Sequence, residues 1–435
     1  MAIFGSNHLL APLLFIGYLI ALSWMLTRIR FFSASGLTRQ QLILIFLLKS
    51  AAGIFYGWLG IYYAKTANMT DTWFFHASSL QEEQLLFTDP VRFFSELYLD
   101  PYGDGKWKLL GTENSYWNDL KANALIKGLA LLNLITGGHY LVNVLFYNFI
   151  GMFGVIGFYK VLADRYQNQR SAVAITCILI PSVLFWTSGI HKEGLLFTAL
   201  GGVVYTTYFA FQQKHWGLKK ILILLVSLLT ILIFRNHLLF ALLPALLLWF
   251  LLERFPRNKT NLSLGLYTAF LLLFFLSPLI HPKANLPQAV VAKQNEFLQL
   301  KGNSSLEVDS LQPTPVGFLK NLPQAVDMAL TRPHPGNVRH LLSLAAFLEV
   351  LLWAGLLLLR LRFPDRTTKW PTTSIDYFSI TLSISVILII GFSINNLGAI
   401  ARYRSVILIL LLIPLTAGID WKKLINSASF KLKFI

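Results

Sequence analysis

Long apolar runs alternate with short polar connections along nearly the whole chain. The runs cover residues 8–27, 40–63, 139–162, 171–189, 194–212, 218–234, 238–252, 262–280, 338–359, 376–395 and 404–419. Most of them are long enough to cross a hydrocarbon core of about 30 Å as helices. The pattern therefore predicts an all-α, polytopic transmembrane bundle of about eleven spans. The first run is interpreted as a retained span, because no small-residue cleavage site follows it.

Lys and Arg are concentrated in alternate connections between these runs. The basic connections are residues 27–39, 164–170, 214–220, 253–259, 361–369 and the tail from Trp421. Short connections rich in Lys and Arg stay on the cytoplasmic side of a membrane. If each basic connection is cytoplasmic, the spans alternate without conflict. This predicts an N-terminus outside and a C-terminus in the cytoplasm.

Residues 120–137 are apolar enough to enter the membrane, but a full crossing there would invert every later connection. An interfacial helix or a re-entrant pair keeps the predicted topology. We favour the interfacial helix, because Lys121 and Lys127 are costly in hydrocarbon.

Two long external segments are expected within a single integral membrane domain that covers residues 1–435. The first, residues 64–138, is rich in aromatic residues, and the second, residues 281–337, is punctuated by prolines. Segments of this length in a compact bundle are usually functional or disordered. We expect both external loops to carry juxtamembrane helices.

Composition supports a membrane protein and argues against nucleic acid as a partner. The 435 residues are 55% hydrophobic and 13% charged, with a formal net charge of +17. The basic residues lie in short connections beside apolar runs, where they set orientation. The only cysteine, Cys177, lies inside an apolar run, so the chain has no disulfide framework and no cysteine metal site.

Strongly polar clusters interrupt the apolar runs on the predicted outer side only. They are Thr70-Asp71-Thr72, His191-Lys192-Glu193, Arg235-Asn236-His237 and Arg402-Tyr403-Arg404. If the chain after residue 70 is helical, Thr72 and His76 share a face with Asp71 beside them. Asp71 can act as a general base toward a hydroxyl or ligate a divalent metal. The alternative is that Asp71 caps a helix.

The basic members of these clusters suit a phosphate group. Lys192 can neutralise a phosphate and His191 can donate to it, whereas the alternative is a solvated turn with a Lys192–Glu193 pair. Arginine binds phosphate through a fork of N–H groups. Basic residues on the outer side run against the orientation bias, although helix-end arginines can also extend to lipid headgroups. The predicted substrate-binding set is His76, His191, Lys192, Glu193, Arg235, His237, Arg332, Arg402, Tyr403 and Arg404.

Several function classes lack their motifs. The chain has no P-loop, no glycine-rich dinucleotide turn, no Ser-x-x-Lys and no Gly-x-Ser-x-Gly sequence. Its spans carry no Asp/Glu array of the kind found in ion-coupled pumps. The missing P-loop argues against an ATPase domain.

Three segments resemble a known architecture: PSVLFWTSGIHKEGLL at 181–196, LPQAVDMALTRPHPG at 322–336 and GAIARYRSVIL at 398–408. The chain resembles bacterial multi-pass glycosyltransferases of the GT-C type and related surface-polysaccharide membrane proteins. The resemblance implies that Asp71 is the base and that Lys192, Arg402 and Arg404 hold a lipid phosphate. Family members usually carry an acidic pair after the first span, whereas Asp71 follows the second span and stands alone until Glu82. Asp100, Asp104 and Glu113 are therefore alternative bases.

The expected function is transfer of a sugar from a polyprenyl-phosphate-linked donor to a glycan, lipid or protein acceptor, at the outer face of a bacterial inner membrane. The expected partners are this lipid-linked sugar and membrane lipids, and a divalent metal is left open. The alternatives are an O-antigen-type polysaccharide polymerase, which would use an oligosaccharide-pyrophosphate lipid, and a flippase for lipid-linked sugars.

Overall fold

The computed structural model describes residues 10–63, 71–110, 114–280, 285–300 and 302–432, with side chains described up to residue 426. The described residues form helices and no strand, apart from two isolated bridges, Ser305–Asn396 and Pro364–Ile419. They group into two compact units. The first unit comprises residues 1–158 and 182–239, and the second comprises residues 159–181 and 240–435. The all-α prediction is confirmed.

Among the described residues, eight helices are long and apolar enough to cross a membrane. They are α1 (Leu10–Arg28), α3 (Arg39–Tyr62), α8 (Tyr140–Arg165), α11 (Lys192–Gln212), α12 (Leu218–Arg254), α13 (Lys259–Ile280), α16 (Leu341–Arg362) and α17 (Ser374–Ser393). The pair α18 (Leu397–Arg404) and α19 (Leu408–Ala417), bent by 67°, would be a ninth span. The chain is therefore a helical membrane protein.

Three of the expected runs differ from simple spans. Residues 171–189 form two short helices, α9 (Arg170–Leu179) and α10 (Pro181–Trp186). Pro181 lacks a backbone N–H and disfavours helix at the residue before it, so the helix ends and restarts there. Residues 218–234 and 238–252 both belong to α12, whose backbone leaves the helical region at Arg235 (φ −158°, ψ 76°). The expected number of eleven spans stays a prediction.

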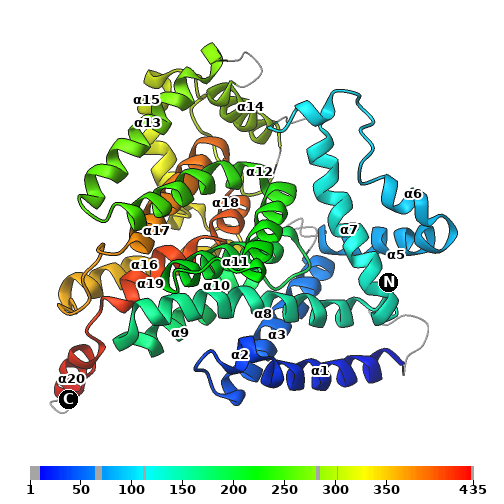
Figure 1. The fold of residues 1–435 in the computed structure, drawn as a ribbon, viewed down its shortest axis with the longest axis horizontal. Coiled ribbons are helices and arrows are strands. Elements are labelled where there is room, and N and C mark those ends of the chain that lie inside the picture. Colours follow the sequence, from blue (N-terminus) through cyan, green and yellow to red (C-terminus); the bar gives the residue numbers. More distant parts are fainter. Residues whose placement is uncertain (1–9, 64–70, 111–113, 281–284, 301, 433–435) are drawn as a thin grey trace. The chain divides into compact units, whose positions relative to one another are not determined.

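In the first unit, the described part of residues 64–138 is largely helical. It contains α5 (Asp71–Thr88), α6 (Pro90–Ser95), the short turn η1 (Gly105–Trp107) and α7 (Tyr116–Thr136). Asp89 begins α6 as its N-cap, accepting from the Arg92 backbone N–H, and Pro90 follows at the first helical position. Helices α5 and α7 run side by side and α6 packs against α5 (Figure 1). The aromatic residues described in this segment therefore belong largely to helices that pack against one another.

Lys127, a basic residue of α7, is paired with acidic residues among these helices. Lys127 is buried, and its Nζ lies 2.6 Å from Glu82 Oε2 and 3.0 Å from Glu96 Oε2. Its ammonium also lies over the Phe93 ring, 4.4 Å from the centroid. The charge is thereby paired with α5 and the chain just after α6. Helix α7 is not among the eight candidate spans, and its placement in the membrane interface stays a prediction.

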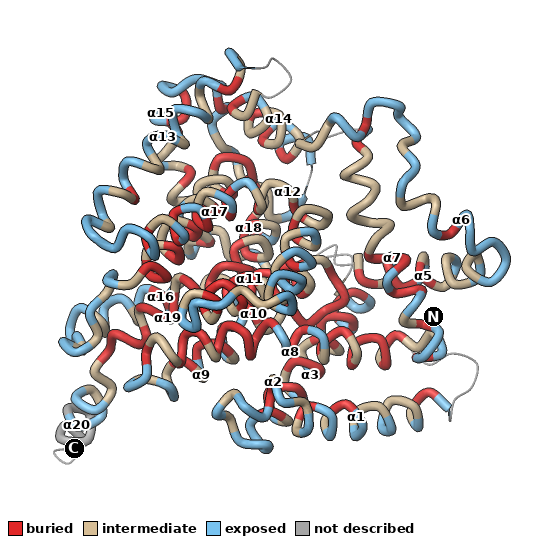
Figure 2. The backbone as a smooth tube through the Cα atoms, viewed as in Figure 1, coloured by how far each residue is buried: buried red, intermediate tan, exposed pale blue. Residues whose placement is uncertain are grey.

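Small residues bring α8 and α11 into backbone contact. A Cβ built at Gly201 would lie 2.8 Å from the Gly154 carbonyl oxygen, and one at Gly154 would lie 2.6 Å from the Thr198 Cα. Close crossings of this kind are typical of helices packed in membranes, because lipid supplies no hydrophobic drive between them. Most residues in the apolar parts of α8 and α11 are buried, whereas few of those in α13 are (Figure 2). Helix α11 carries part of the candidate site at its first turn.

The second unit contains α9, α13 and α16–α19, together with the turn η2 (Gln167–Gln169) and α20 (Trp421–Leu432). The described part of residues 281–337 contributes α14 (Leu286–Gln299), α15 (Pro315–Val326), η4 (Asp327–Thr331) and η5 (Pro335–Asn337). An apolar cluster joins α14 and α15 to the end of α17: Val291, Leu311, Phe318, Ala325 and Phe392. This second predicted loop is therefore folded against the spans of its unit.

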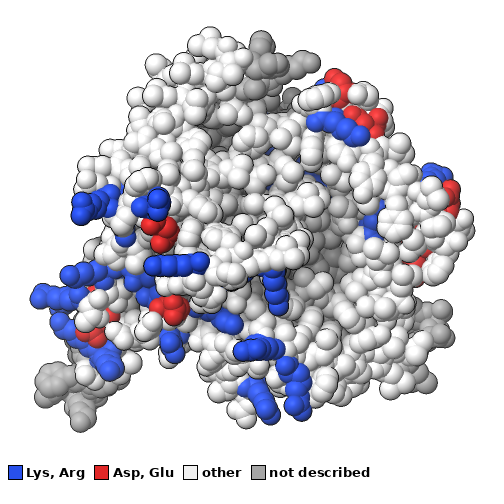
Figure 3. Space-filling view, in the orientation of Figure 1, with Lys and Arg blue, Asp and Glu red and all other residues white. Residues whose placement is uncertain are grey.

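Connections predicted to share one side of the membrane meet in space within the second unit. Arg165 binds Asp376 at 2.7 Å, Lys259 donates to the Thr372 carbonyl at 2.7 Å, and the Asp365 N–H donates to Gly418 O at 2.8 Å. At the opposite end of α17, the Leu306 N–H donates to Asn395 O at 2.9 Å. Figure 3 shows Lys and Arg gathered in separate groups on an otherwise mostly uncharged face. The two ends of α17 are thus bound to different groups of connections.

The backbone contact between α8 and α11 predicts that a larger side chain at Gly201 strongly destabilises the protein. Gly201→Leu should destabilise the protein by at least about 2 kcal/mol, because the new side chain meets backbone that has no room to move. The measurement is unfolding of the purified protein in detergent. Gly17→Leu on α1 is the matched control, since a Cβ at Gly17 meets nothing within 4 Å. Equal stabilities for the two variants would contradict the crossing.

Candidate functional site

Four charged or titratable side chains form a continuous row in the first unit. Asp71 is the first described residue of α5, His191 is the N-cap of α11, Glu193 lies in the first turn of α11, and Arg235 lies at the break in α12. Asp71 Oδ2 lies 3.3 Å from His191 Nε2, and His191 Nδ1 is hydrogen-bonded to Glu193 Oε2. Arg235 Nη2 donates to Glu193 Oε1 at 2.5 Å. We call these residues the Asp71–Arg235 row.

Exposure changes steeply along the row. The Asp71 side chain is 47% exposed, whereas that of His191 is 5% exposed and that of Glu193 is fully buried. A buried carboxylate is costly unless it is paired and hydrogen-bonded. Arg235, which stays protonated, supplies the opposite charge. The Asp71 carboxylate is therefore the accessible group of the row. The other members are buried, and there the charge of Glu193 is balanced by that of Arg235.

The number of protons that the row holds is set by its hydrogen bonds. A bond from His191 to the Glu193 carboxylate needs a proton on Nδ1. Nε2 then either accepts from a protonated Asp71 or, in a cationic imidazole, donates to an ionised one. In both cases a single proton is shared between Asp71 and His191. When this shared proton is absent, Asp71 is ionised and Nε2 is unprotonated, and the arrangement can then take up one proton at Asp71 and share it with His191.

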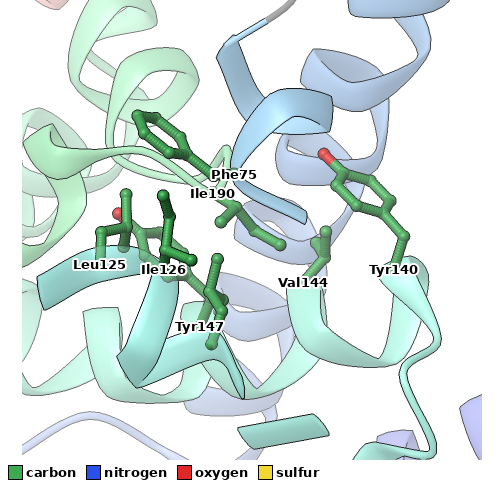
Figure 4. Close-up of a cluster of buried hydrophobic side chains, with 8 residues drawn as sticks. Phe75, Leu125, Ile126, Tyr140, Val144, Tyr147 and Ile190 are labelled. Atoms are coloured by element: carbon green, nitrogen blue, oxygen red, sulfur yellow. The ribbon is translucent and has the colours of Figure 1, made fainter. Parts of the chain in front are cut away.

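The chain between α10 and α11 holds His191 in place through contacts with α8. Tyr147 OH donates to the His191 carbonyl, and Asn148 Nδ2 donates to Ser188 O at 2.9 Å. Below this turn lies an apolar cluster that joins Phe75 of α5 and Ile190 to α7 and α8 (Figure 4). In Figure 4 the side chains of Leu125, Ile126 and Val144 approach this group from the other helices. Asp71 and His191 are thus brought together by the packing of the residues beside them.

Other predicted residues of the first unit lie close to the row. The Lys192 ammonium is 5.7 Å from the centroid of the Phe75 ring, and Phe75 is one helical turn from Asp71. Beyond the α12 break, Asn236 donates to the Leu109 carbonyl, and His237 is half-buried. The structure therefore brings together three distant segments of the sequence, which carry Asp71, His191 to Glu193, and Arg235.

Asp71 occupies the first turn of α5, where a carboxylate is favoured by the helix dipole. Thr70 lies outside the described residues. Thr72 and His76 share a face as predicted, and both meet Tyr140: Thr72 Oγ1 lies 2.8 Å from its hydroxyl. That face is buried against α8 and points away from solvent. The helix is confirmed, and its Thr72 side serves packing.

His76 is a buried, neutral side chain. Its ring contacts Tyr140 and Trp73 with centroid separations of 5.4 Å and 6.1 Å. Burial, with a smaller effect of His139, lowers the His76 pKa to about 4. The imidazole therefore carries no charge near pH 7. This position favours packing over the predicted role in binding an anionic substrate.

The remaining predicted residues belong to the second unit. Arg404 is 2% exposed, and its Nη1 donates to the carbonyls of Ala329 at 3.1 Å and Arg332 at 3.0 Å. Its guanidinium lies over the Trp353 ring, 4.5 Å from the centroid. A side chain this buried does not extend to lipid headgroups. Arg332, whose carbonyl accepts from Arg404, also binds Asp327 Oδ2 through its Nε at 2.7 Å.

Arg402 and Tyr403 are half-buried neighbours of Arg404 at the end of α18. The Arg402 guanidinium lies 5.4 Å from the centroid of the Tyr403 ring. Unlike Arg404, this pair is partly accessible. Arg402 is thus the more accessible arginine of α18 for an external anion.

The alternative bases are placed less favourably than Asp71. Asp100 accepts from the backbone N–H groups of Tyr102 at 3.1 Å and Lys106 at 2.9 Å, which is a turn-forming role. Asp104 forms an exposed ion pair with Lys108 at 2.8 Å. Glu113 lies outside the described residues. Asp100 therefore holds a turn and Asp104 an exposed ion pair, whereas Asp71 contacts the buried His191.

Within the described ranges, no group of three or more His, Cys, Asp or Glu side chains is arranged to hold a metal ion. Cys177 is buried in α9. Sequence reasoning missed Tyr147 and Asn148, because polar residues within an apolar run carry no sign of what they contact. Lys49, a basic residue in the middle of a predicted span, was a signal that could have been used.

Loss of the Arg235 charge should leave Glu193 buried without its counterion. Arg235→Met is expected to cost about 3–5 kcal/mol of unfolding free energy. The double variant Arg235→Met/Glu193→Gln should recover a large part of this loss. Arg92→Met, which removes an exposed partner of Glu96, is the control and should cost less than about 1 kcal/mol. A double variant no more stable than Arg235→Met would contradict the pairing.

Because His76 is neutral in the folded protein, the stability of the protein should fall on acidification over a defined pH range. The unfolded chain binds a proton at this side chain below about pH 6.5, whereas the folded protein does so only below about pH 4. Stability should therefore be complete above about pH 6.5 and decline toward pH 4, by about 3 kcal/mol at most. Thermal unfolding from pH 7 to 4.5 should show a shallower decline for His76→Gln than for the wild type. The exposed-site control His215→Gln should match the wild type, and a wild-type slope in His76→Gln would refute the prediction.

Comparison of the chain with protein-family models, with curated proteins and with solved structures gave no match.

Proposed function

We propose that the protein transfers a sugar from a polyprenyl-phosphate-linked donor to a hydroxyl group of a glycan, lipid or protein acceptor. The observation that carries the proposal is the Asp71–Arg235 row. Its outer end is an accessible carboxylate, and its inner end is a buried imidazole, carboxylate and guanidinium in series. Such a row suits removal of a proton from an acceptor hydroxyl.

In the proposed reaction, Asp71 accepts the proton of the acceptor hydroxyl as its oxygen forms a bond to the anomeric carbon of the sugar. The bond between that carbon and the donor phosphate oxygen breaks, and the phosphate leaves with the electron pair. Attack opposite the leaving group inverts the anomeric configuration. The reaction starts with Asp71 ionised and with His191 neutral, carrying its proton on Nδ1. The incoming proton becomes the one that Asp71 and His191 share, and Glu193 stabilises the cationic imidazole. Arg235 keeps Glu193 ionised and in place.

Lys192 is the cation of the first unit that supports binding of the leaving phosphate. It follows His191 directly, and its ammonium lies near Phe75, on the same helix as Asp71. A charge next to the breaking bond favours the transition state over the ground state. In the second unit, Arg402 and Arg404 are the residues predicted to hold a phosphate. Arg404 is buried and binds the Ala329 and Arg332 carbonyls, so Arg402 is the more accessible of the two.

The proposal includes a membrane topology of about eleven spans with the N-terminus outside and the C-terminus in the cytoplasm. Helix α12 supports it. At about 1.5 Å per residue, its 37 residues would be about 55 Å long, well beyond a hydrocarbon core of about 30 Å. Its break at Arg235 allows two crossings joined at the predicted outer rim. A donor that stays in the lipid needs its reacting group at such a rim, in a bacterial inner membrane.

The lipid-linked donor that the protein uses distinguishes the proposed sugar transfer from the nearest alternative, a polysaccharide polymerase. Transfer of single sugars from a monophosphate lipid supports the proposed reaction, whereas elongation from an oligosaccharide-pyrophosphate lipid would indicate a polymerase. Protected movement of either lipid without transfer would indicate a flippase. The charged residues of the row lie at helix ends and at a helix break, and this favours a site at the rim over a path through the membrane.

Asp71→Asn should abolish sugar transfer while the protein remains folded. The amide keeps the shape of the side chain but does not accept a proton, so the rate should fall by about 10²–10⁴-fold. The assay uses purified protein in liposomes, a panel of polyprenyl-phosphate monosaccharides with radiolabelled sugars, and acceptor lipids or glycans.

Asp104→Asn is the matched control, because Asp104 is an exposed carboxylate in the same predicted external segment, residues 64–138, where it pairs with Lys108. It should transfer at the wild-type rate. Full activity of Asp71→Asn would remove Asp71 from the mechanism, and loss confined to Asp104→Asn would move the base to that residue.

A further inference from the structure

Lys49 is a buried lysine in the middle of α3. It is 2% exposed, although α3 is apolar enough to span a membrane. Its Nζ donates to Thr187 Oγ1 at 3.0 Å, to Ser188 Oγ at 3.0 Å and to the Thr187 carbonyl at 3.3 Å. Each N–H of the ammonium group therefore has an acceptor in the chain just before His191. An ionisable group at such a position is costly and calls for a specific role.

The surroundings of Lys49 are shaped to admit it. Gly151 of α8 faces its side chain, and a Cβ there would lie 3.1 Å from Lys49 Cε. One turn along α3, a Cβ at Gly53 would lie 2.7 Å from Asn148 Nδ2 and would also overlap the Ser188 carbonyl. Without these glycines, α3, α8 and the chain at residues 187–191 would stand further apart. The lysine then would not reach its acceptors.

The acceptors of Lys49 lie in a segment with little support from its own backbone. Helix α10 ends at Trp186 and α11 begins at Lys192. Between them, the Thr187 and Ser188 N–H groups make single bonds back to α10, at 3.1 Å and 3.4 Å. The remaining bonds come from side chains: Lys49 of α3, and Asn148 and Tyr147 of α8. The position of His191 thus depends on these three side chains.

Lys49 contributes more bonds than its two companions. Asn148 reaches one backbone carbonyl of the segment and Tyr147 reaches another, whereas Lys49 binds one carbonyl and two hydroxyl groups. Thr187 Oγ1 in turn donates to the Val183 carbonyl at 2.7 Å. The lysine therefore ties the end of α10 and the start of the segment to α3. From Thr187, four residues lead to His191.

We propose that Lys49 is a positioning residue that holds residues 187–191 so that His191 stays hydrogen-bonded to Glu193 and in reach of Asp71. It acts through the turn and touches no reacting atom. Only the consequence for sugar transfer rests on the proposed function. The consequence for the His191–Glu193 hydrogen bond stands without it.

The test is the imidazole signal of His191 in the protein labelled with [15N]histidine and held in detergent micelles. The Nδ1–H that bonds to Glu193 should give a far-downfield proton resonance, assigned by its absence in His191→Gln. Lys49→Met should lose this resonance, while Lys49→Arg, which keeps the charge and the donors, should restore it at least in part. Lys160→Met, which removes a half-buried lysine of α8, should leave it unchanged.

A resonance that is unchanged in folded Lys49→Met would overturn the proposal and leave Lys49 a purely structural residue. If Lys49→Met does not fold, the double variant Thr187→Val/Ser188→Ala removes two of the three acceptors and keeps the lysine. Loss or displacement of the resonance in that variant supports the proposal, and an unchanged resonance overturns it.

Activity is measured separately in the liposome assay with polyprenyl-phosphate monosaccharides. Positioning predicts that Lys49→Met lowers kcat by at least tenfold with little change in KM. If the resonance is lost in Lys49→Met but the wild type transfers no sugar, the proposed function fails and the positioning role stands. If the wild type transfers sugar and folded Lys49→Met retains both resonance and rate, the positioning role fails alone.

Discussion

The burial of the Glu193 carboxylate is the constraint on which the first unit depends. A fully buried negative charge is tolerated only with a cation and a hydrogen-bond donor in contact, and Arg235 and His191 supply these. Meeting that requirement brings the break in α12 and the first turn of α11 together. It also aligns His191 with Asp71. One desolvated group therefore organises residues that are far apart in the sequence.

The helices around this charge are packed to keep it in position. Gly154 and Gly201 let α8 and α11 cross in backbone contact, and Gly53 lets α3 approach Ser188. The apolar cluster that contains Phe75 and Ile190 fills the space under the row. Because Lys49 then binds the end of α10, the turn before His191 is fixed from both α3 and α8. Close packing and polar contacts thus act on the same short segment.

The second unit uses arginine differently. Arg404 is buried, binds two backbone carbonyls and lies over Trp353, so its charge organises the chain between α15 and α16. Arg332 is balanced by Asp327 in the same region. The sequence pattern marked Arg402 and Arg404 as equivalent, but only Arg402 is partly accessible. Arg402 and Arg404 are only two positions apart on a short helix, but their side chains lie in different environments.

The sequence by itself determined that the chain is an all-α membrane protein, because apolar runs of span length leave the backbone no partner in lipid except its own helix. It also determined the segments that carry candidate chemistry, since charges are rare in such runs. It did not show that α12 breaks at Arg235 rather than ending there, or that His76 is neutral and Lys49 is bonded to Thr187. Those features depend on which side chains meet across helices, and desolvation and hydrogen bonding act only once the neighbours are in place. Only the tertiary structure decided that Asp71, His191, Glu193 and Arg235 form one row.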